Sequence, residues 1–178
     1  RGEEIVKFSK RTGNAITIEE LIEEVGKSAV RYFFVMRSLD TQMDFDLELA
    51  KKNSNENPVY YVEYAHARCC SILKEAEKKQ LTISTEFNKI SVDSCNELLS
   101  KLYEYENVIE SSAAKRSPHI LTNYIYELSS IFHSYYASDK VITDDYELSK
   151  EKLAIINATR IIISKALMLL GIEAREKM

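Results

Sequence analysis

The sequence contains few of the residues that interrupt helices and form turns. Only two prolines and four glycines occur among 178 residues. A fold with many strands and tight turns needs more of both, so their scarcity favours long helices. No stretch shows the strict alternation of a strand, and we therefore predict an all-α fold. The length fits one large domain, or one domain with an appendage.

Cysteine, histidine and long apolar runs are also scarce. The three cysteines, Cys69, Cys70 and Cys95, show neither Cys-x-x-Cys nor Cys/His ligand spacing, so we expect no metal site. Their unpatterned placement fits a reducing cytoplasm. The longest apolar stretch, residues 161–170, contains a lysine and is too short to cross a bilayer. We therefore expect a cytoplasmic protein with no membrane partner.

An excess of positive charge is missing as well. The net charge is −4, whereas general affinity for nucleic acid depends on neutralising phosphates. Binding to RNA would therefore depend on local basic clusters, each of which is equally explained as a solvated helix face or loop. These clusters are Lys7/Lys10/Arg11, Lys78/Lys79, Lys115/Arg116 and Arg160/Lys165.

What the sequence does contain is apolar residues at helical spacing. They make up 45% of the chain, enough for a core, which excludes a disordered chain. The periodicity and the capping residues predict helices at 18–25, 27–37, 46–53, 58–79, from 94 onward, 118–138 and 146–170. Segments 80–92 and 139–146 are polar connections.

Particular residues mark the ends of these helices. Thr17 followed by Glu20 predicts a capping box, and Ser117 is expected to cap the helix that begins at Pro118. Asn55 and Asn57 are candidates for capping the helix that begins at Pro58, and a place at a domain junction is the alternative explanation for them. Gly171 is expected just beyond the last helix. Because the second half of that helix is apolar nearly all round, we place it at the centre of the bundle.

The first basic cluster belongs to a loop with unusual chemistry. It comprises Lys7-Phe8-Ser9-Lys10-Arg11-Thr12-Gly13-Asn14. Two ammonium groups and a hydroxyl suit a triphosphate, although by spacing alone a solvated basic loop is the commoner explanation. The loop resembles the Lys-Met-Ser-Lys-Ser signature of class I aminoacyl-tRNA synthetases. Lys7, Ser9 and Lys10 match it, whereas Phe8 and Arg11 replace its Met and its final Ser.

Further stretches narrow the resemblance to bacterial arginyl-tRNA synthetases. Ser28-Ala29-Val30-Arg31 stands where that family often has Asp-Ala-Leu-Arg. The remaining stretches that carry the resemblance are Asp44-Phe45-Asp46-Leu47, Asn55-Glu56-Asn57-Pro58-Val59-Tyr60-Tyr61-Val62, Tyr64-Ala65-His66-Ala67-Arg68, Phe132-His133-Ser134-Tyr135-Tyr136 and Leu169-Leu170-Gly171-Ile172. The resemblance implies an all-α helical bundle of the class I synthetase anticodon-binding, DALR-type kind. It also implies three parts: residues 1–16 as the ATP-site signature loop from the end of a catalytic domain, 17–57 as connecting helices, and 58–178 as the anticodon-binding bundle.

The resemblance also implies chemistry for the complete enzyme. An arginine–tRNA ligase activates arginine with ATP, accompanied by Mg²⁺, and charges tRNA(Arg). Lys7, Ser9 and Lys10 would bind ATP and stabilise the pyrophosphate leaving group, with Lys10 the more important lysine. The sequence lacks the His-Ile-Gly-His type motif and the strand–helix alternation of a nucleotide-binding domain. We therefore expect the chain to be inactive alone and to hold no cofactor tightly.

Recognition of an arginine anticodon needs particular side chains. Every arginine codon has G in the middle, so every arginine anticodon has C there. A single-stranded base is recognised by stacking on a ring or guanidinium plane and by hydrogen bonds to its edge. The resemblance assigns this task to Arg68, Tyr136 and Met178. A structural salt bridge is the rival explanation of Arg68, and Met178 can contribute only if residues 171–178 fold back across the bundle.

Two predictions complete the sequence analysis. His66 and His133 lie beside apolar rows and are expected to be packing residues rather than ligands or bases. The function expected is the tRNA-binding part of an arginine–tRNA ligase, acting as a monomer. The alternative is a helical module without enzymatic function that docks a protein partner through its apolar faces.

Overall fold

A computed structural model describes residues 16–178, and these form a bundle of helices. Lys7, Ser9 and Lys10 lie outside the described residues. The helices are α1 (Ile18–Val25), α2 (Lys27–Val35), α3 (Leu47–Lys51), α4 (Pro58–Lys78), α5 (Val92–Tyr103), α6 (Tyr105–Ala114), α7 (His119–Ser138) and α8 (Tyr146–Leu169). No strand occurs in this part of the chain, which confirms the all-α prediction. None of these helices is both long and apolar enough to cross a membrane.

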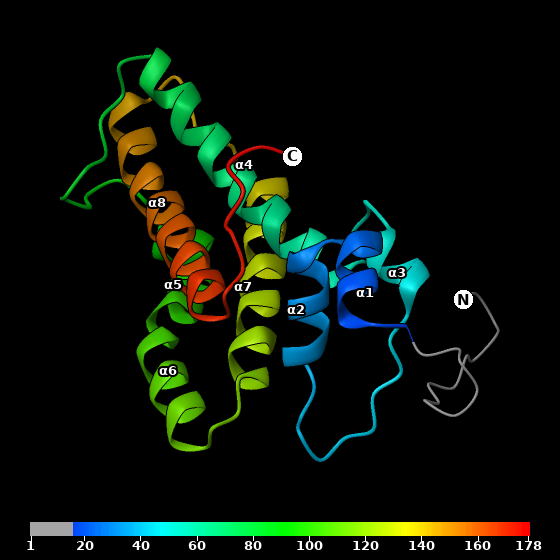
Figure 1. Ribbon diagram of the computed structural model, residues 1–178. Helices are drawn as coiled ribbons and strands as arrows, with labels where there is room; N and C mark the ends of the chain where they lie inside the picture. Colours follow the sequence, from blue (N-terminus) through cyan, green and yellow to red (C-terminus); the bar gives the residue numbers. More distant parts are fainter. Residues whose placement is uncertain (1–15) are drawn as a thin grey trace.

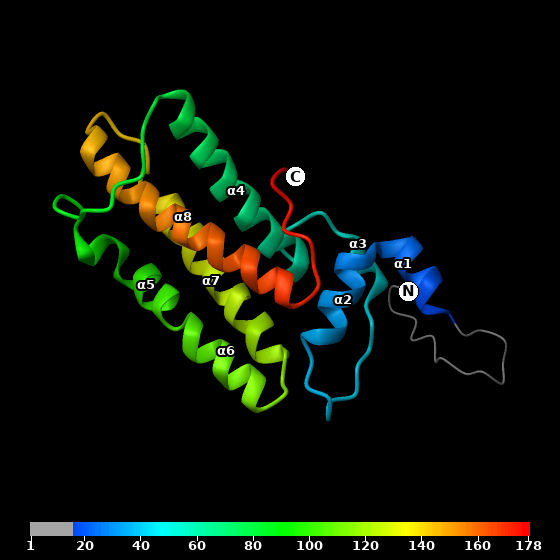
Figure 2. The same cartoon turned by 60° about the vertical axis from the view of Figure 1, so that its left-hand side comes forward.

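The bundle consists of long helices with a smaller group of short ones at one end. α4, α7 and α8 pack against one another, and α5 and α6 lie along α7. α1, α2 and α3 gather beside the N-terminal end of α4 (Figure 1). After α8 the chain turns back and runs beside α4, so that the C-terminus lies at the side of the bundle next to α4 (Figure 2).

Local signals place most helix ends where the sequence predicts them. The capping box of α1 is present, because Thr17 N–H donates to Glu20 Oε2 (2.7 Å) and Glu20 N–H donates to Thr17 Oγ1 (3.2 Å). α4 begins at Pro58. Gly171 follows α8 with a φ of 71°, and its N–H donates to the Met168 carbonyl (2.9 Å). This is the left-handed C-terminal glycine that the sequence predicts.

The caps predicted at Asn57 and Ser117 are wrong in detail. Asn57 precedes α4, but its side-chain Nδ2 donates to the carbonyls of Ala50 (3.1 Å) and Lys52 (2.9 Å) at the end of α3. Asn57 therefore ties α3 to α4 rather than capping α4. Ser117 belongs to the turn that closes α6, where its N–H donates to the Ser112 carbonyl (2.9 Å). α7 begins two residues later, at His119.

The helix predicted from residue 94 starts earlier and is interrupted. α5 begins at Val92, and a break at Glu104 separates it from α6. At this break Tyr124 of α7 donates its hydroxyl proton to the Lys101 carbonyl (2.8 Å). A continuous helix would offer that carbonyl to the N–H of residue 105. A contact between helices thus accounts for an end that no local signal marks.

The prediction that α8 lies at the centre is also wrong. The central helix is α7, which packs against α2, α4, α5, α6 and α8. The apolar excess of α8 continues to its exposed end, where Met168 and Leu169 are 68% and 57% exposed. The core instead contains fully buried side chains from α2, α5, α7 and α8, including Tyr32, Leu98, Phe132 and Leu153.

Candidate functional site

A groove with aromatic walls runs between α4, the end of α7 and the C-terminal tail. We call it the α4–α7 groove, and its volume is about 490 Å³. The three residues that the sequence analysis assigned to the anticodon, Arg68, Tyr136 and Met178, all line it. Tyr64, Glu75 and Lys177 line it as well. Residues from three separate segments are therefore brought together at one place.

Arg68 lies between two tyrosine rings. Its guanidinium carbon is 4.6 Å from the centroid of the Tyr64 ring and 4.9 Å from that of the Tyr136 ring. Its Nη2 also donates a hydrogen bond to the Tyr64 hydroxyl. Tyr64 and Arg68 are neighbours because side chains four residues apart share a helix face. Within residues 16–178 no ion pair links Arg68 to a carboxylate, so the rival salt bridge is not found there.

The rings beside Arg68 continue as an aromatic stack. The Tyr60 and Tyr64 rings are 6.2 Å apart and within 14° of parallel. The His133 ring of α7 stacks on Tyr64 at 5.4 Å and tilts against Tyr61 at 4.7 Å. Burial lowers the pKa of His133 below its usual value, with Arg68 nearby acting in the same direction. A neutral, packed imidazole agrees with the role predicted for His133, and it supports Tyr64 from behind.

The C-terminal tail folds back across α4, which brings Met178 to the groove. The Arg175 carbonyl lies 2.8 Å from His66 Nδ1, and Lys74 Nζ pairs with Glu176 Oε2 at 2.7 Å. His66 is 3% exposed, and its burial lowers its pKa. His66 is thus a packing residue, as predicted, and it positions the tail. Met178 remains 49% exposed at the groove.

Arg31 of α2 holds the start of this tail. Its Nε donates a hydrogen bond to the Leu170 carbonyl at the end of α8. The absence of a side chain at Gly171 leaves room for that contact, because a Cβ there would collide with the Arg31 guanidinium. Ile172 N–H donates to the Leu167 carbonyl (2.9 Å), and the Ile172 side chain is buried. The direction of the tail is therefore fixed at its first two residues.

The groove offers the groups that a single flat heterocycle needs. Tyr136, 36% exposed, presents a ring, and Arg68 presents guanidinium donors held in place by the two tyrosines. Glu75 provides an acceptor, and Lys177 adds positive charge. A second cavity of about 450 Å³ continues past Tyr136 along residues 137–142. An unstacked base with its backbone fits this combination of ring, donor and acceptor.

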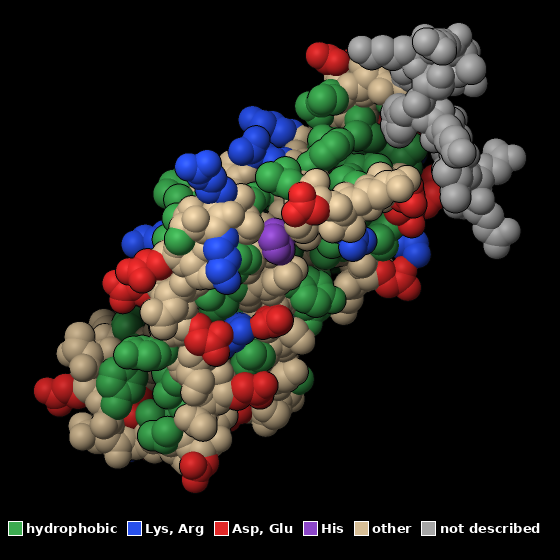
Figure 3. Space-filling model, turned by 90° about the horizontal axis from the view of Figure 1, so that it is seen from below, with side chains coloured by type: hydrophobic (Ala, Val, Ile, Leu, Met, Phe, Trp, Pro, Cys, Tyr) green, Lys and Arg blue, Asp and Glu red, His purple; other side chains and the backbone are tan. Residues whose placement is uncertain are grey.

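On the face of the molecule seen in Figure 3, basic side chains form no broad field of their own. Figure 3 shows one face on which basic, acidic and apolar side chains are interspersed. Of the clusters marked in the sequence, Arg160 is engaged by Asn157 Oδ1, at 3.2 Å from its Nε and 3.0 Å from its Nη2.

The comparisons with known proteins agree on one family. The family model described as DALR anticodon binding domain matches residues 62–178. The chain is 54% identical to an arginine–tRNA ligase of Staphylococcus epidermidis (strain ATCC 12228), with 99% of this chain and 32% of that protein covered. The chain thus spans about a third of the length of the curated relatives it matches.

Solved structures give the same result. A Campylobacter jejuni structure described as an arginyl-tRNA synthetase matches 93% of this chain and 36% of its own, with a TM-score of 0.80 and 28% identity. The arginyl-tRNA synthetase of Thermus thermophilus matches 95% of this chain and 29% of its own, with a TM-score of 0.72 and 26% identity. The helical bundle is therefore shared with these proteins.

Proposed function

The chain belongs to the DALR anticodon-binding domain family, and from this premise we propose that it is the anticodon-recognising part of an arginine–tRNA ligase. In this proposal the α4–α7 groove receives the middle anticodon base of tRNA(Arg). The observation that carries it is the Arg68 guanidinium held between Tyr64 and Tyr136, in a groove that Met178 also lines. The complete ligase would activate arginine with ATP and esterify the tRNA.

The chemistry of cytosine fits this arrangement. Cytosine has an exocyclic amino donor beside two acceptors on its edge. The ring of Tyr136 offers a stacking surface, and the Arg68 guanidinium offers donors for the acceptor atoms. Glu75 supplies an acceptor for the amino group. The tyrosines on both sides of Arg68 limit its rotation, so little conformational entropy is lost when a base binds.

The other parts of the proposal rest on the resemblance. Lys7, Ser9 and Lys10 are proposed to bind ATP, with Mg²⁺, when the catalytic domain is present. We assign residues 1–16 to the end of that domain, 17–57 to connecting helices and 58–178 to the anticodon-binding bundle. We further propose that the protein is cytoplasmic and monomeric, and that this chain alone has no ligase activity.

The test compares two RNA hairpins that carry the anticodon arm of an arginine tRNA. One has the natural middle C and the other has G at that position. Binding to this chain is measured by fluorescence anisotropy at two salt concentrations. We expect a clear preference for C at both, because base contacts depend less on salt than phosphate contacts do. Equal binding that weakens steeply with salt would indicate backbone contacts only, and would overturn the proposed groove.

Variants identify the groove as the site of the preference. Stacking contributes about 1–3 kcal/mol per base, so Tyr136→Ala should weaken binding of the C hairpin by roughly ten- to a hundredfold. Tyr103→Ala is the matched control, because Tyr103 is 84% exposed on α5 and outside the groove. Equal losses in both variants would contradict the assignment. Absence of binding to either hairpin would favour the alternative, a protein-docking module.

A further inference from the structure

The last residue of the chain, Met178, lines two cavities. One is the α4–α7 groove, which Met178 lines together with Arg68 and Tyr136. The other has a volume of about 330 Å³ and lies between α2, the start of α4 and the C-terminal tail. The Met178 side chain is 49% exposed, so its thioether is open to small reagents in solution.

Other groups in residues 16–178 that react with a mild oxidant are either buried or outside the groove. The three cysteines are buried, and burial raises the pKa of each thiol, so little of the reactive thiolate forms. Met36 and Met43 are partly buried and pack against the core. Met168 is 68% exposed at the end of α8, but it does not line the groove. A dilute peroxide should therefore oxidise chiefly Met168 and Met178.

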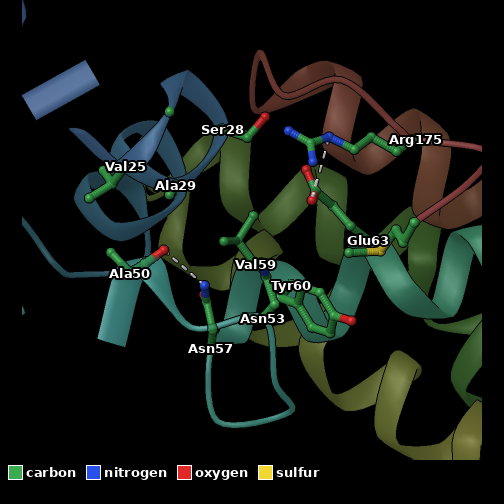
Figure 4. Close-up of a pocket in the computed structure, with 12 residues that line it drawn as sticks. Val25, Ser28, Ala29, Ala50, Asn53, Asn57, Val59, Tyr60, Glu63 and Arg175 are labelled. Carbon is green, nitrogen blue, oxygen red and sulfur yellow. Dashed lines mark hydrogen bonds and ion pairs between the residues drawn. The ribbon is translucent and has the colours of Figure 1, made fainter. Parts of the chain in front are cut away.

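Oxidation would convert the Met178 thioether into a polar sulfoxide, whose oxygen accepts hydrogen bonds. The 330 Å³ cavity is poorly suited to another acceptor. Two of its lining residues, Asn57 and Glu63, are buried, and neither Asn57 Oδ1 nor Glu63 Oε1 accepts a hydrogen bond from any of residues 16–178. Arg175 also lines this cavity, but its side chain is directed toward Glu63 (Figure 4). The sulfoxide oxygen is therefore disfavoured on this side.

The α4–α7 groove, in contrast, offers donors to a sulfoxide. An arginine side chain carries several N–H donors, and Nη2 of Arg68 donates to the Tyr64 hydroxyl. The Arg68 guanidinium is also the group that we assign to the middle anticodon base. A sulfoxide oxygen in the same groove would accept from this guanidinium and compete with the base for it. Oxidation would also replace apolar contact surface at the groove with a polar group.

We propose that Met178 is a redox-sensitive site, and that its oxidation by hydrogen peroxide weakens binding of RNA at the α4–α7 groove. The sulfur attacks one peroxide oxygen, an S–O bond forms and the O–O bond breaks. The departing hydroxide takes the proton of the transferred oxygen and becomes water. Sulfur loses two electrons and the peroxide gains two, so no further reactant is needed. The inference rests on the proposed function, because only a groove that binds RNA can lose affinity for it.

The anchors of the C-terminal tail precede Met178 and do not depend on it. The Arg175 carbonyl lies 2.8 Å from His66 Nδ1, and Lys74 Nζ lies 2.7 Å from Glu176 Oε2. Oxidation should therefore act locally without releasing the tail, and the thermal unfolding temperature should stay unchanged. Because a sulfoxide carries no charge, the loss of affinity should be the same at low and high salt.

The experiment treats the chain with dilute hydrogen peroxide, removes the peroxide and titrates the middle-C hairpin before and after treatment. The unaltered chain is compared with Met178→Leu and with Met168→Leu as the matched control, since leucine keeps the apolar volume but cannot form a sulfoxide. We expect treatment to weaken binding about tenfold in the unaltered chain and in Met168→Leu. Met178→Leu should keep the affinity that it had before treatment.

The oxidation should also be reversible. Methionine sulfoxide reductases, one for each sulfoxide epimer, remove the oxygen as water and oxidise two thiols to a disulfide. Incubation of the treated chain with both reductases and a thiol should restore its affinity for the middle-C hairpin. Affinity that stays low after mass spectrometry shows Met178 fully reduced would overturn the proposal.

Mass spectrometry of peptides from the treated chain follows each methionine separately. Met168 and Met178 should gain oxygen faster than Met36 and Met43. A saturating concentration of the middle-C hairpin should slow oxidation of Met178 severalfold and leave that of Met168 unchanged, because the bound base covers the groove. Equal oxidation of Met178 with and without the hairpin would show that the thioether does not lie at the bound RNA.

The outcomes separate this inference from the proposed function. A preference for the middle-C hairpin that is unchanged when Met178 is fully oxidised would overturn the redox-sensitive site and leave the α4–α7 groove standing. A loss in Met178→Leu as large as that in the unaltered chain would do the same, because it would assign the loss to another residue. Absence of binding by the untreated chain would overturn the proposed function and this inference with it.

Discussion

Replacing Gly171 with alanine should loosen the C-terminal tail through two separate effects. Gly171 has a φ of 71°, a left-handed conformation that disfavours any residue with a Cβ. The new methyl group would also meet the Arg31 guanidinium, which donates to the Leu170 carbonyl. Either the tail or the Arg31 side chain must then move. Because the tail carries Arg175 and Met178, the change should affect both stability and RNA binding.

The magnitude of each effect follows from its cause. The left-handed conformation disfavours alanine by about 1–2 kcal/mol, and loss of the hydrogen bond from Arg31 removes about 1 kcal/mol. We therefore expect Gly171→Ala to lower the free energy of unfolding by about 2–3 kcal/mol. In a chain that already carries Arg31→Ala, the same replacement should lower it by only about 1–2 kcal/mol. The difference is the coupling energy between the two residues.

Urea unfolding followed by circular dichroism measures all four proteins of this cycle. Binding of the middle-C hairpin, measured in parallel, should be weaker in Gly171→Ala than in the unaltered chain. A coupling energy of zero would show that Arg31 and Gly171 do not act together. A decrease in stability below about 0.5 kcal/mol would contradict the left-handed conformation itself. If Gly171→Ala were clearly destabilised but bound RNA as tightly as the unaltered chain, the position of the tail would not contribute to RNA binding at the groove.

Three further predictions concern a cation in the groove and two buried ionisable groups. Arg68→Lys keeps the charge but loses the plane held between the tyrosines, so binding of the middle-C hairpin should weaken about tenfold with little change in thermal stability. Glu151 accepts hydrogen bonds from the N–H groups of residues 88–90, which lower its pKa. Folding is therefore stabilised above the unfolded pKa of Glu151 and loses that contribution as the pH falls, so urea unfolding of Glu151→Gln should depend less on pH between 7 and 4. Burial lowers the pKa of His66 in the folded state, so stability should fall as the pH drops through the unfolded value near ~6.5; His66→Asn should lack this decrease, and an unchanged pH profile would assign it to another group.

The sequence predicts those parts of the fold that depend on local signals. The capping box at Thr17, the start of α4 at Pro58 and the left-handed Gly171 all follow from residues near one another in the chain. Where the structure differs from the prediction, the cause is a contact between residues that are far apart in the sequence. The Tyr124 hydroxyl donates a hydrogen bond to the Lys101 carbonyl at the break between α5 and α6. The periodicity within one helix contains no information about such a contact.

The central position of α7 is a second departure of this kind. Both α7 and α8 carry apolar residues over much of their surface, so composition alone favours α8 with its longer apolar run. The choice depends on which helix the others surround, and α2, α4, α5, α6 and α8 surround α7. Exposed Met168 and Leu169 show that an apolar run need not be buried to its end.

The candidate site was predicted in part. The resemblance supplied Arg68, Tyr136 and Met178, and the structure places all three at one groove. Tyr61, Tyr64 and Arg68 share one face of α4 because of their i, i+3, i+7 spacing. The stacking of His133 on Tyr64, in contrast, depends on how α7 packs against α4. Lys7, Ser9 and Lys10 lie outside the described residues, and their role stays a prediction.

The burial of Glu63 had no signal in the sequence. Glu63 appears there as one of many acidic residues on an amphipathic helix, and its burial follows from the packing of α2 and the tail against α4. The tail in turn is directed by Gly171, which is far from Glu63 in the sequence, and by His66, which lies one turn along α4 from Glu63. Buried acceptors without partners become visible only when these segments are assembled.

The most direct test of the central claim is the affinity of this chain for two hairpins that differ only in a middle C or a middle U. The two bases have similar size and stack alike, but uracil replaces the amino donor of cytosine with a carbonyl and its ring acceptor with an N–H. If the α4–α7 groove recognises the edge of the middle base, calorimetry should give a Kd at least about tenfold lower for C, a difference of about 1.4 kcal/mol. Equal Kd values for the two hairpins would contradict base recognition at this groove.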